Sequence, residues 1–268
     1  MTIHIIGIPS DESSSFMRGP AQAPPRIRQV LNWGSANMTS ELGIDLGDNS
    51  NWQDMGDVEV GTGEQGRLDI ETAVSHHLSQ ADHLLTWGGD HAITYPIIRA
   101  YAQKYPDLTI VQLDAHPDLY DSLDGDRYSH ACPFARIMEE GLVKRLVQVG
   151  IRCLTGHQQE QAEKFGVEII SAWEWQKLFS LHFDGPVYIS LDLDVFDPAY
   201  APGVSHHEPG GLTSRDVLSI IQTLDANIVG ADVVELNIHR DLVNMTAMLA
   251  AKCSKELLAR MLSNHTAA

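Results

Sequence analysis

Short apolar segments alternate along the chain with amphipathic segments, and this alternation constrains the fold more than any other feature. The apolar segments are nearly continuous in hydrophobicity, as expected for strands buried on both faces of a parallel sheet. They cover residues 3–8, 84–87, 108–113, 146–151, 167–170, 187–193 and 228–236. The amphipathic segments have helical periodicity and cover residues 67–80, 92–104, 133–140, 156–165, 173–181, 214–224 and 245–262. We therefore expect βαβ units and an α/β fold with one parallel sheet, which could be an open sheet or a closed barrel.

The overall composition excludes several functional classes. The chain has 268 residues, 43% of them hydrophobic, so it can bury a sizeable core in one or two domains. Its net charge of −18 disfavours nucleic acid and anionic membranes and favours cationic partners. The first residues lack the basic segment of a secretory signal, and Cys132, Cys153 and Cys253 lie far apart in sequence. We expect free thiols and a cytoplasmic protein, with no membrane segment.

Three long loops follow predicted strands and are rich in Gly, Pro, Ser and Asp. They cover residues 10–25, 118–130 and 197–211. Ligands of open α/β sheets bind beyond the carboxyl ends of the strands, so we expect the functional site in these loops.

Metal-ligand side chains gather where three of the strands end. Asp114, His116 and Asp118 stand at i, i+2 and i+4, so in an extended chain they point to one side. Asp192 and Asp194 have the same relation after another strand, and His91 follows a third. So many carboxylates cannot be buried together as anions, because each raises the pKa of its neighbours. Bound cations remove this conflict. Imidazole and carboxylate ligands without thiolate suit Mn²⁺, with Fe²⁺, Co²⁺, Ni²⁺ and Zn²⁺ as substitutes, and the number of ligands favours two ions.

At these residues the sequence resembles the ureohydrolase family, which comprises arginases, agmatinases and related binuclear manganese hydrolases. The segments that carry the resemblance are GGDH at 88–91, DAHPD at 114–118 and SLDLDVFDP at 190–198. Further similar segments are SSFMRGP at 14–20, YSHA at 128–131, APGVSHHEPGGL at 201–212 and DVVELN at 232–237. The similarity extends over nearly the whole chain and is greatest to plant-type arginases and their agmatinase-like bacterial relatives.

The resemblance implies a three-layer α/β/α fold with an eight-stranded, mainly parallel sheet, in a single domain over residues 1–268. It also implies two Mn²⁺ ions per chain and a homo-oligomer, either a trimer or a hexamer. The first ion would be bound by His91, Asp114, Asp118 and Asp192. The second would be bound by Asp114, His116, Asp192 and Asp194.

The resemblance further implies an activity and the residues that carry it. Water activated between the two ions would attack a guanidino compound, arginine or agmatine, and release urea and an amine. Glu235 matches the glutamate that orients the guanidinium group, and His130 matches an active-site histidine that can donate the proton to the leaving amine. Asp118 would accept a hydrogen bond from the attacking water as well as bind metal.

Two positions depart from the family pattern, and the substrate stays open. Ala92 stands where many members have Ser, and Ile238 replaces the usual Pro after Asn237, which puts the backbone of that loop in question. The acidic residues of loop 118–130 slightly favour a substrate tail without a carboxylate, such as agmatine. Arginine and 4-guanidinobutanoate remain alternatives. A single-zinc deacetylase-like hydrolase would leave His116 and Asp194 unexplained, and a non-catalytic metal-binding protein would not need His130 and Glu235.

Overall fold

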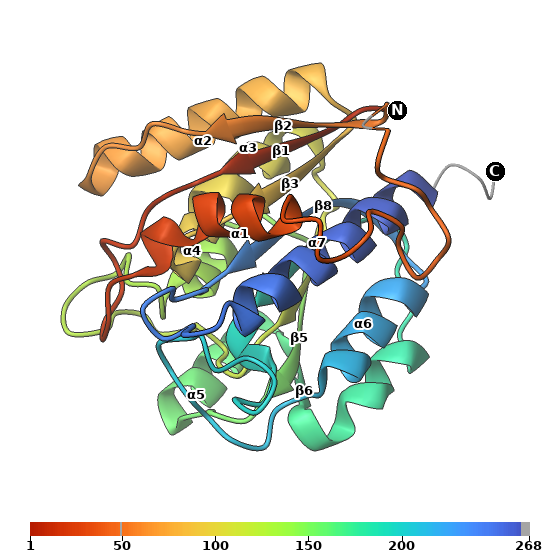
Figure 1. The fold of residues 1–268 in the computed structure, drawn as a ribbon. Coiled ribbons are helices and arrows are strands. Elements are labelled where there is room, and N and C mark those ends of the chain that lie inside the picture. The colour runs from red at the N-terminus through yellow and green to blue at the C-terminus, as the bar shows by residue number, and fades with distance from the viewer. Residues whose placement is uncertain (49, 264–268) are drawn as a thin grey trace.

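The chain folds around an open eight-stranded sheet (Figure 1). The computed structural model describes residues 1–48 and 50–263. In chain order the strands are β1 (Ile3–Gly7), β2 (Trp52–Asp57), β3 (His83–Trp87), β4 (Thr109–Leu113), β5 (Arg145–Ile151), β6 (Glu168–Ser171), β7 (Pro186–Asp192) and β8 (Asn227–Val234). Across the sheet their order is β2-β1-β3-β8-β7-β4-β5-β6, and every neighbouring pair is parallel. This confirms the expected α/β class and excludes the closed barrel.

Helices cover both faces of the sheet, which confirms the three-layer arrangement. The α-helices are α1 (Ala23–Leu31), α2 (Gly63–Gln80), α3 (Thr94–Lys104), α4 (Pro133–Glu139), α5 (Gly156–Phe165), α6 (Ser214–Thr223) and α7 (Met245–Ser263). Short 3₁₀ segments are η1 (Pro20–Gln22), η2 (His91–Ile93), η3 (Ala172–Ser180) and η4 (Leu193–Val195). Helices α1, α6 and α7 pack on the face turned toward the viewer in Figure 1. Helices α2, α3, α4 and α5 pack on the opposite face.

The central strands are buried on both faces, as their continuous hydrophobicity predicts. In β7, Val187, Ile189 and Leu191 face the layer of α1, α6 and α7, whereas Tyr188 faces the layer of α2 to α5. All four side chains have no exposed surface. The same alternation in β3, β4 and β8 gives each layer its own core, and it leaves the carboxyl ends of these strands to polar residues.

The structure differs from the sequence-based expectation in three elements. Strand β2 was not among the predicted segments because it lies at the edge of the sheet, where only Trp52 is buried. Helix α1 begins inside the predicted loop 10–25, with prolines in its first turn, a position that tolerates the missing N–H. Residues 172–180 form a 3₁₀ helix rather than the predicted α-helix.

Two other sequence-based expectations, on membrane-spanning helices and on the cysteines, can be compared with the described residues. No helix among residues 1–48 and 50–263 has the length and apolar character needed to cross a membrane. The three cysteines are free, as expected, and Cys132 and Cys253 are buried.

Candidate active site

Four neighbouring strands end at the candidate site. In the sheet order β3-β8-β7-β4, His91 follows β3, Glu235 follows β8, Asp192 ends β7 and Asp114 follows β4. Because parallel strands end at the same edge of a sheet, residues up to 144 positions apart meet there, as the hydrogen bond from the His91 N–H to Glu235 Oε1 shows.

Glycine after β3 lets three loops pack closely at this edge. A Cβ atom on Gly89 would lie 1.7 Å from the carbonyl oxygen of Ser10, so no other residue fits there. The Gly89 carbonyl accepts a hydrogen bond from the N–H of Glu235 at 2.9 Å. Asp118 and Glu235 themselves have φ angles of 50° and 66°, a left-handed backbone conformation that residues other than glycine rarely adopt. Such strain concentrates at functional sites.

The structure brings all six predicted metal ligands to this edge. Two groups of candidate ligand atoms, within 4.8 Å of one another in each group, share Asp114. They are His91, Asp114 and Asp118, and Asp114, His116 and Asp194. Asp192 joins both groups, because its Oδ2 lies 3.2 Å from His91 Nδ1 and its Oδ1 accepts the Asp194 N–H at 2.8 Å.

A chain of hydrogen bonds fixes which nitrogen of His91 faces the carboxylates. Ser190 donates its hydroxyl proton to Asp232 at 2.8 Å, and Asp232 also accepts from the hydroxyls of Tyr188 and Thr94. The Ser190 oxygen can therefore only accept, so His91 Nε2 donates to it at 2.9 Å. His91 Nδ1 is left facing the carboxylate cluster.

The surroundings of His91 Nδ1 fit a metal ion better than a proton. Oxygens of Asp114, Asp118 and Asp192 lie 3.0–3.2 Å from this nitrogen, yet none of them forms a hydrogen bond of good geometry with it. A proton on Nδ1 could bond only one of these oxygens well, whereas a cation among them would bind all three and the nitrogen. Four ionised carboxylates and two neutral imidazoles also match the charge of two divalent cations. Oxygen ligands with imidazole suit Mn²⁺ and related ions.

The pKa values of the cluster show how strongly it needs positive charge. Burial and the charges of Asp194 and Asp114 raise the pKa of Asp192 well above its usual value. Burial and the charge of Asp114 raise the pKa of Asp118 to about 6. The pKa of His116 is raised although burial opposes it, because the Asp194 carboxylate stabilises the imidazolium. Protonated imidazoles thus compensate the carboxylates when no metal ion does so.

Two buried glutamines orient Asp114. Gln112 Nε2 donates to Asp114 Oδ2 at 2.7 Å, and the Gln112 oxygen accepts from Gln148 Nε2 at 2.6 Å. The other oxygen of Asp114 accepts the N–H of His116 at 2.6 Å. Sequence reasoning missed these glutamines, as it missed Ser190 as a partner of His91 and Asp232 as a partner of Ser190. The one available signal was a polar residue inside an otherwise apolar strand.

His130 and Glu235 form a buried ion pair beside the metal ligands. His130 Nδ1 lies 2.8 Å from Glu235 Oε1, and its Nε2 lies 2.8 Å from the hydroxyl of Ser15. Although burial opposes it, the Glu235 carboxylate raises the pKa of His130 to about 9. The pKa of Glu235 is lowered against burial by the charge of His130. Glu235 Oε1 also accepts the N–H of His91, so within the described chain only Oε2 is left without a hydrogen bond.

A cavity of about 510 Å³ opens over these groups. It is lined by the predicted site residues His116, Asp118, His130 and Glu235, and also by His206 from loop 197–211. The centre of the His206 ring lies 5.3 Å from that of His130, so His206 borders the site, a role that sequence reasoning did not assign. The volume suits a small molecule.

The loop after Glu235 is well anchored despite the Ile238 replacement. The Asn237 N–H donates to the Gly203 carbonyl at 2.8 Å, and its side-chain amide donates to Ser205 at 2.9 Å. The Asn237 side-chain oxygen accepts the N–H of His239. Ile238 packs against the core, so isoleucine is accommodated at this position.

Two of the four aspartates of loop 118–130 are engaged in the site or in ion pairs. Asp118 belongs to the metal cluster, and Asp121 forms ion pairs with Arg127 at 2.7 Å and Arg136 at 3.1 Å. Asp124 and Asp126 have no cationic side chain within 4 Å in the described chain, so the sequence-based preference for a substrate tail without a carboxylate, which rested on the negative charge of this loop, stays a prediction.

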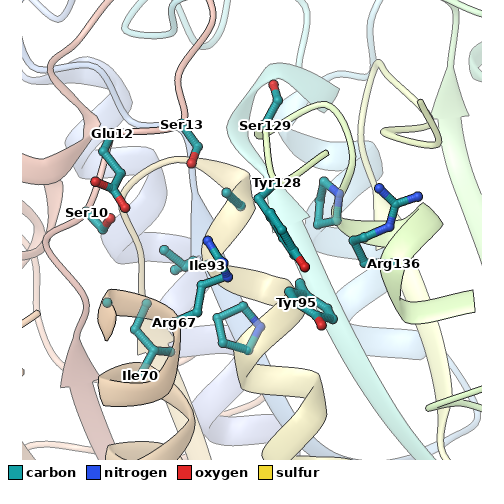
Figure 2. A pocket seen from close by; sticks show the side chains of 14 residues that line it. Ser10, Glu12, Ser13, Arg67, Ile70, Ile93, Tyr95, Tyr128, Ser129 and Arg136 are labelled. Atoms are coloured by element: carbon teal, nitrogen blue, oxygen red, sulfur yellow. The ribbon is translucent and has the colours of Figure 1, made fainter. Parts of the chain in front are cut away.

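A second cavity lies against the segment that carries His130. Figure 2 shows Arg67 between Ser13 and Tyr128, and its guanidinium carbon lies 3.7 Å from the centre of the Tyr128 ring. The free space of about 20 Å³ holds about one water molecule. This cavity is therefore too small for a guanidino substrate.

Comparison with known proteins gives consistent matches over nearly the whole chain. The family profile described as "Arginase family" matches residues 1–259. A mitochondrial arginase 1 from Oryza sativa subsp. indica is 45% identical over 274 residues, which cover 96% of this chain and 81% of that protein. An agmatinase from Bacillus anthracis is 35% identical over 262 residues, which cover 95% of this chain and 90% of that protein.

Solved structures show the same relationship. The arginase from Medicago truncatula superposes with a TM-score of 0.91 at 42% identity, over 97% of this chain and 87% of that one. The proclavaminate amidino hydrolase from Streptomyces clavuligerus also gives a TM-score of 0.91, at 31% identity, over 98% of this chain and 93% of that one.

Proposed function

This chain belongs to the arginase family of hydrolases that act on guanidino compounds, and we propose that it hydrolyses arginine, agmatine or a related guanidino compound with two Mn²⁺ ions. One observation carries the proposal. Two groups of metal-ligand side chains share Asp114, and the His130–Glu235 pair lines the same cavity as His116 and Asp118. The products would be urea and an amine.

Two bound divalent ions would supply a water of lowered pKa, able to attack near neutral pH. They would be bound by the six residues predicted from the sequence: His91, Asp114, His116, Asp118, Asp192 and Asp194. A single-ion site would leave His116 and Asp194 without a role, although His116 Nδ1 lies only 2.9 Å from Asp194 Oδ2.

The protein's own side chains orient the substrate and move protons. Glu235 Oε2, free of other hydrogen bonds in the described chain, accepts from the cationic guanidinium and holds its carbon for attack. Asp118 accepts a hydrogen bond from the attacking water. His130, whose pKa is raised to about 9 by Glu235 against the effect of burial, carries the proton that the departing amine needs.

A urea-release assay tests this function. Protein loaded with Mn²⁺ is given arginine, agmatine, 4-guanidinobutanoate and 3-guanidinopropanoate in turn, and urea is measured over time. We expect metal-dependent urea release from at least one of them. Absence of urea from all four, with metal bound, would contradict the proposal. Full activity with a single Zn²⁺ ion would instead favour the single-zinc alternative.

Assembly and location stay predictions, the first from the family resemblance and the second from the composition of the chain. We expect a homo-oligomer, either a trimer or a hexamer, and a cytoplasmic protein. A monomeric mass in light scattering would contradict the first expectation.

A further inference from the structure

The first turn of α5 forms one wall of the substrate cavity. Helix α5 begins after Thr155 and packs directly on the loop that follows the metal ligands of β4. There the ring of His157 stacks on Tyr120, with centres 5.7 Å apart, and its Nε2 accepts the Asp121 N–H at 3.2 Å. Thr155 and Gln158 both line the cavity.

Hydrogen bonds fix the orientation of the Gln158 amide. Its oxygen accepts from the backbone N–H of Thr155 at 3.4 Å and from the Thr155 hydroxyl at 3.2 Å, which closes a capping box. Because a backbone N–H can only donate, the amide oxygen must lie on the Thr155 side. The NH₂ group of Gln158 is therefore the part left for the cavity, and it donates to nothing in the described chain.

This arrangement leaves a hydrogen-bond donor at the cavity surface without a protein acceptor. Gln158 as a whole residue is only 2% exposed, yet its Nε2 atom is not among the fully buried side-chain atoms that lack a partner, so it keeps contact with the cavity that Gln158 lines. A group inside the cavity can therefore accept from this donor. Water can fill this role in the empty site, and an acceptor on the substrate can fill it when the substrate binds.

One cationic side chain without a carboxylate partner lies on this wall. Arg152 also lines the cavity, and no carboxylate lies within 4 Å of its guanidinium in the described chain. It donates instead to backbone carbonyls, including those of Asp194 and Glu208. The nearby Asp121 is paired with two arginines. The Glu208 carboxylate lines the cavity too, but this residue is exposed at its mouth.

We propose that Gln158 determines substrate specificity by donating a hydrogen bond to a carboxylate at the tail of the guanidino substrate. The inference rests on the proposed function and narrows it to guanidino acids, that is arginine or 4-guanidinobutanoate, in preference to agmatine. Glu235 and Gln158 follow β8 and β5, which are three strand spacings apart in the sheet, or about 14 Å. Their side chains enter the same cavity from these two ends, which leaves room for a short guanidino acid between them.

The decisive variant is Gln158→Glu. Its carboxylate can still accept from Thr155 N–H and keep the capping box, so the fold should survive. It replaces the donor in the cavity with an anion. We expect kcat/KM to fall roughly 10- to 100-fold for arginine and 4-guanidinobutanoate, mainly through KM, and to rise for agmatine. Gln158→Met, which removes the donor without adding charge, should weaken the two acids and leave agmatine nearly unchanged.

Gln159→Glu is the matched control. Gln159 is exposed, does not line the cavity and donates to Glu163 at 2.8 Å, so the same added charge there should leave the substrate preference unchanged. Wild-type preference for agmatine over both acids would overturn the inference, and so would an unchanged acid-to-agmatine ratio in Gln158→Glu. Absence of urea from every substrate with the metal-loaded wild type would instead overturn the proposed function.

Discussion

Replacing Glu235 with Gln should reduce activity by an amount that grows with pH. The substitution keeps an oxygen that can accept from His91 N–H and from His130, so the local structure should persist. It removes the charge that pairs with the guanidinium. The expected loss of transition-state stabilisation is on the order of 2–4 kcal/mol, or roughly 30- to 1000-fold in kcat/KM.

A second, pH-dependent loss follows from the His130 pair. Against the effect of burial, the Glu235 carboxylate raises the pKa of His130 from 6.5 to about 9. Without that charge the pKa should fall back toward about 6.5, the value of an unperturbed imidazole. At pH 8 the protonated fraction would then drop from about 0.9 to about 0.03, whereas at pH 6 it would change little. The defect of Glu235→Gln should therefore be about 20-fold larger at pH 8 than at pH 6.

The assay is urea release at both pH values with saturating Mn²⁺, with bound metal measured in each sample. His130→Asn is the matched comparison, because it lacks the proton donor at every pH. It should lose about 10²-fold in kcat. Equal defects of Glu235→Gln at pH 6 and pH 8, with equal metal content, would refute the assignment of His130 as a proton donor poised by Glu235.

Three further predictions follow from the same contacts. Asp192→Asn should lose more bound metal than Asp197→Asn, because Asp192 lies beside His91 whereas Asp197 accepts only from backbone N–H groups of its own loop. Equal losses of metal from the two variants in elemental analysis would contradict this prediction. Ser190→Ala should weaken Mn²⁺ binding about 10- to 100-fold in calorimetric titration, because His91 loses the acceptor that orients it. The ion pair of His130 with Glu235 should stabilise the folded state by at most about 3 kcal/mol below about pH 6.5, and this stabilisation should be lost as the pH rises through about 9. The difference in Tm between wild type and His130→Asn should therefore shrink over that pH range.

The sequence predicts the architecture well where local pattern and tertiary burial agree. Six of the seven apolar segments became β1, β3, β4, β5, β7 and β8, because burial on both faces demands uninterrupted hydrophobicity. The seventh became the edge strand β6, in which only Ile170 is buried. The sequence pattern did not predict strand β2, because an edge strand needs only one buried face. In β2 the buried Trp52 is followed by polar and exposed positions. The sequence pattern did not predict helix α1, because prolines such as Pro24 and Pro25 are typical of loops. A helix nevertheless tolerates proline in its first turn.

The site is predictable to the extent that its residues are close in sequence. Spacing at i, i+2 and i+4 placed Asp114, His116 and Asp118 at one site, and in the structure Asp114 groups with Asp118 on one side and with His116 on the other. Contacts between separate strands leave no such trace. The hydrogen bond between Gln148 and Gln112 joins residues 36 positions apart, and nothing local marks either as a partner of Asp114. The same holds for the ion pair of His130 and Glu235, which the family resemblance supplied and spacing did not.

Metal titration of the metal-free protein, with bound Mn²⁺ and urea release followed in the same samples, tests the two-metal hydrolase most directly. Two groups of ligands that share Asp114 predict that urea release rises with added Mn²⁺ and reaches its plateau at two ions per chain. A plateau at one ion per chain would contradict the two-metal site. Two bound ions without urea from any guanidino compound would contradict the hydrolase itself.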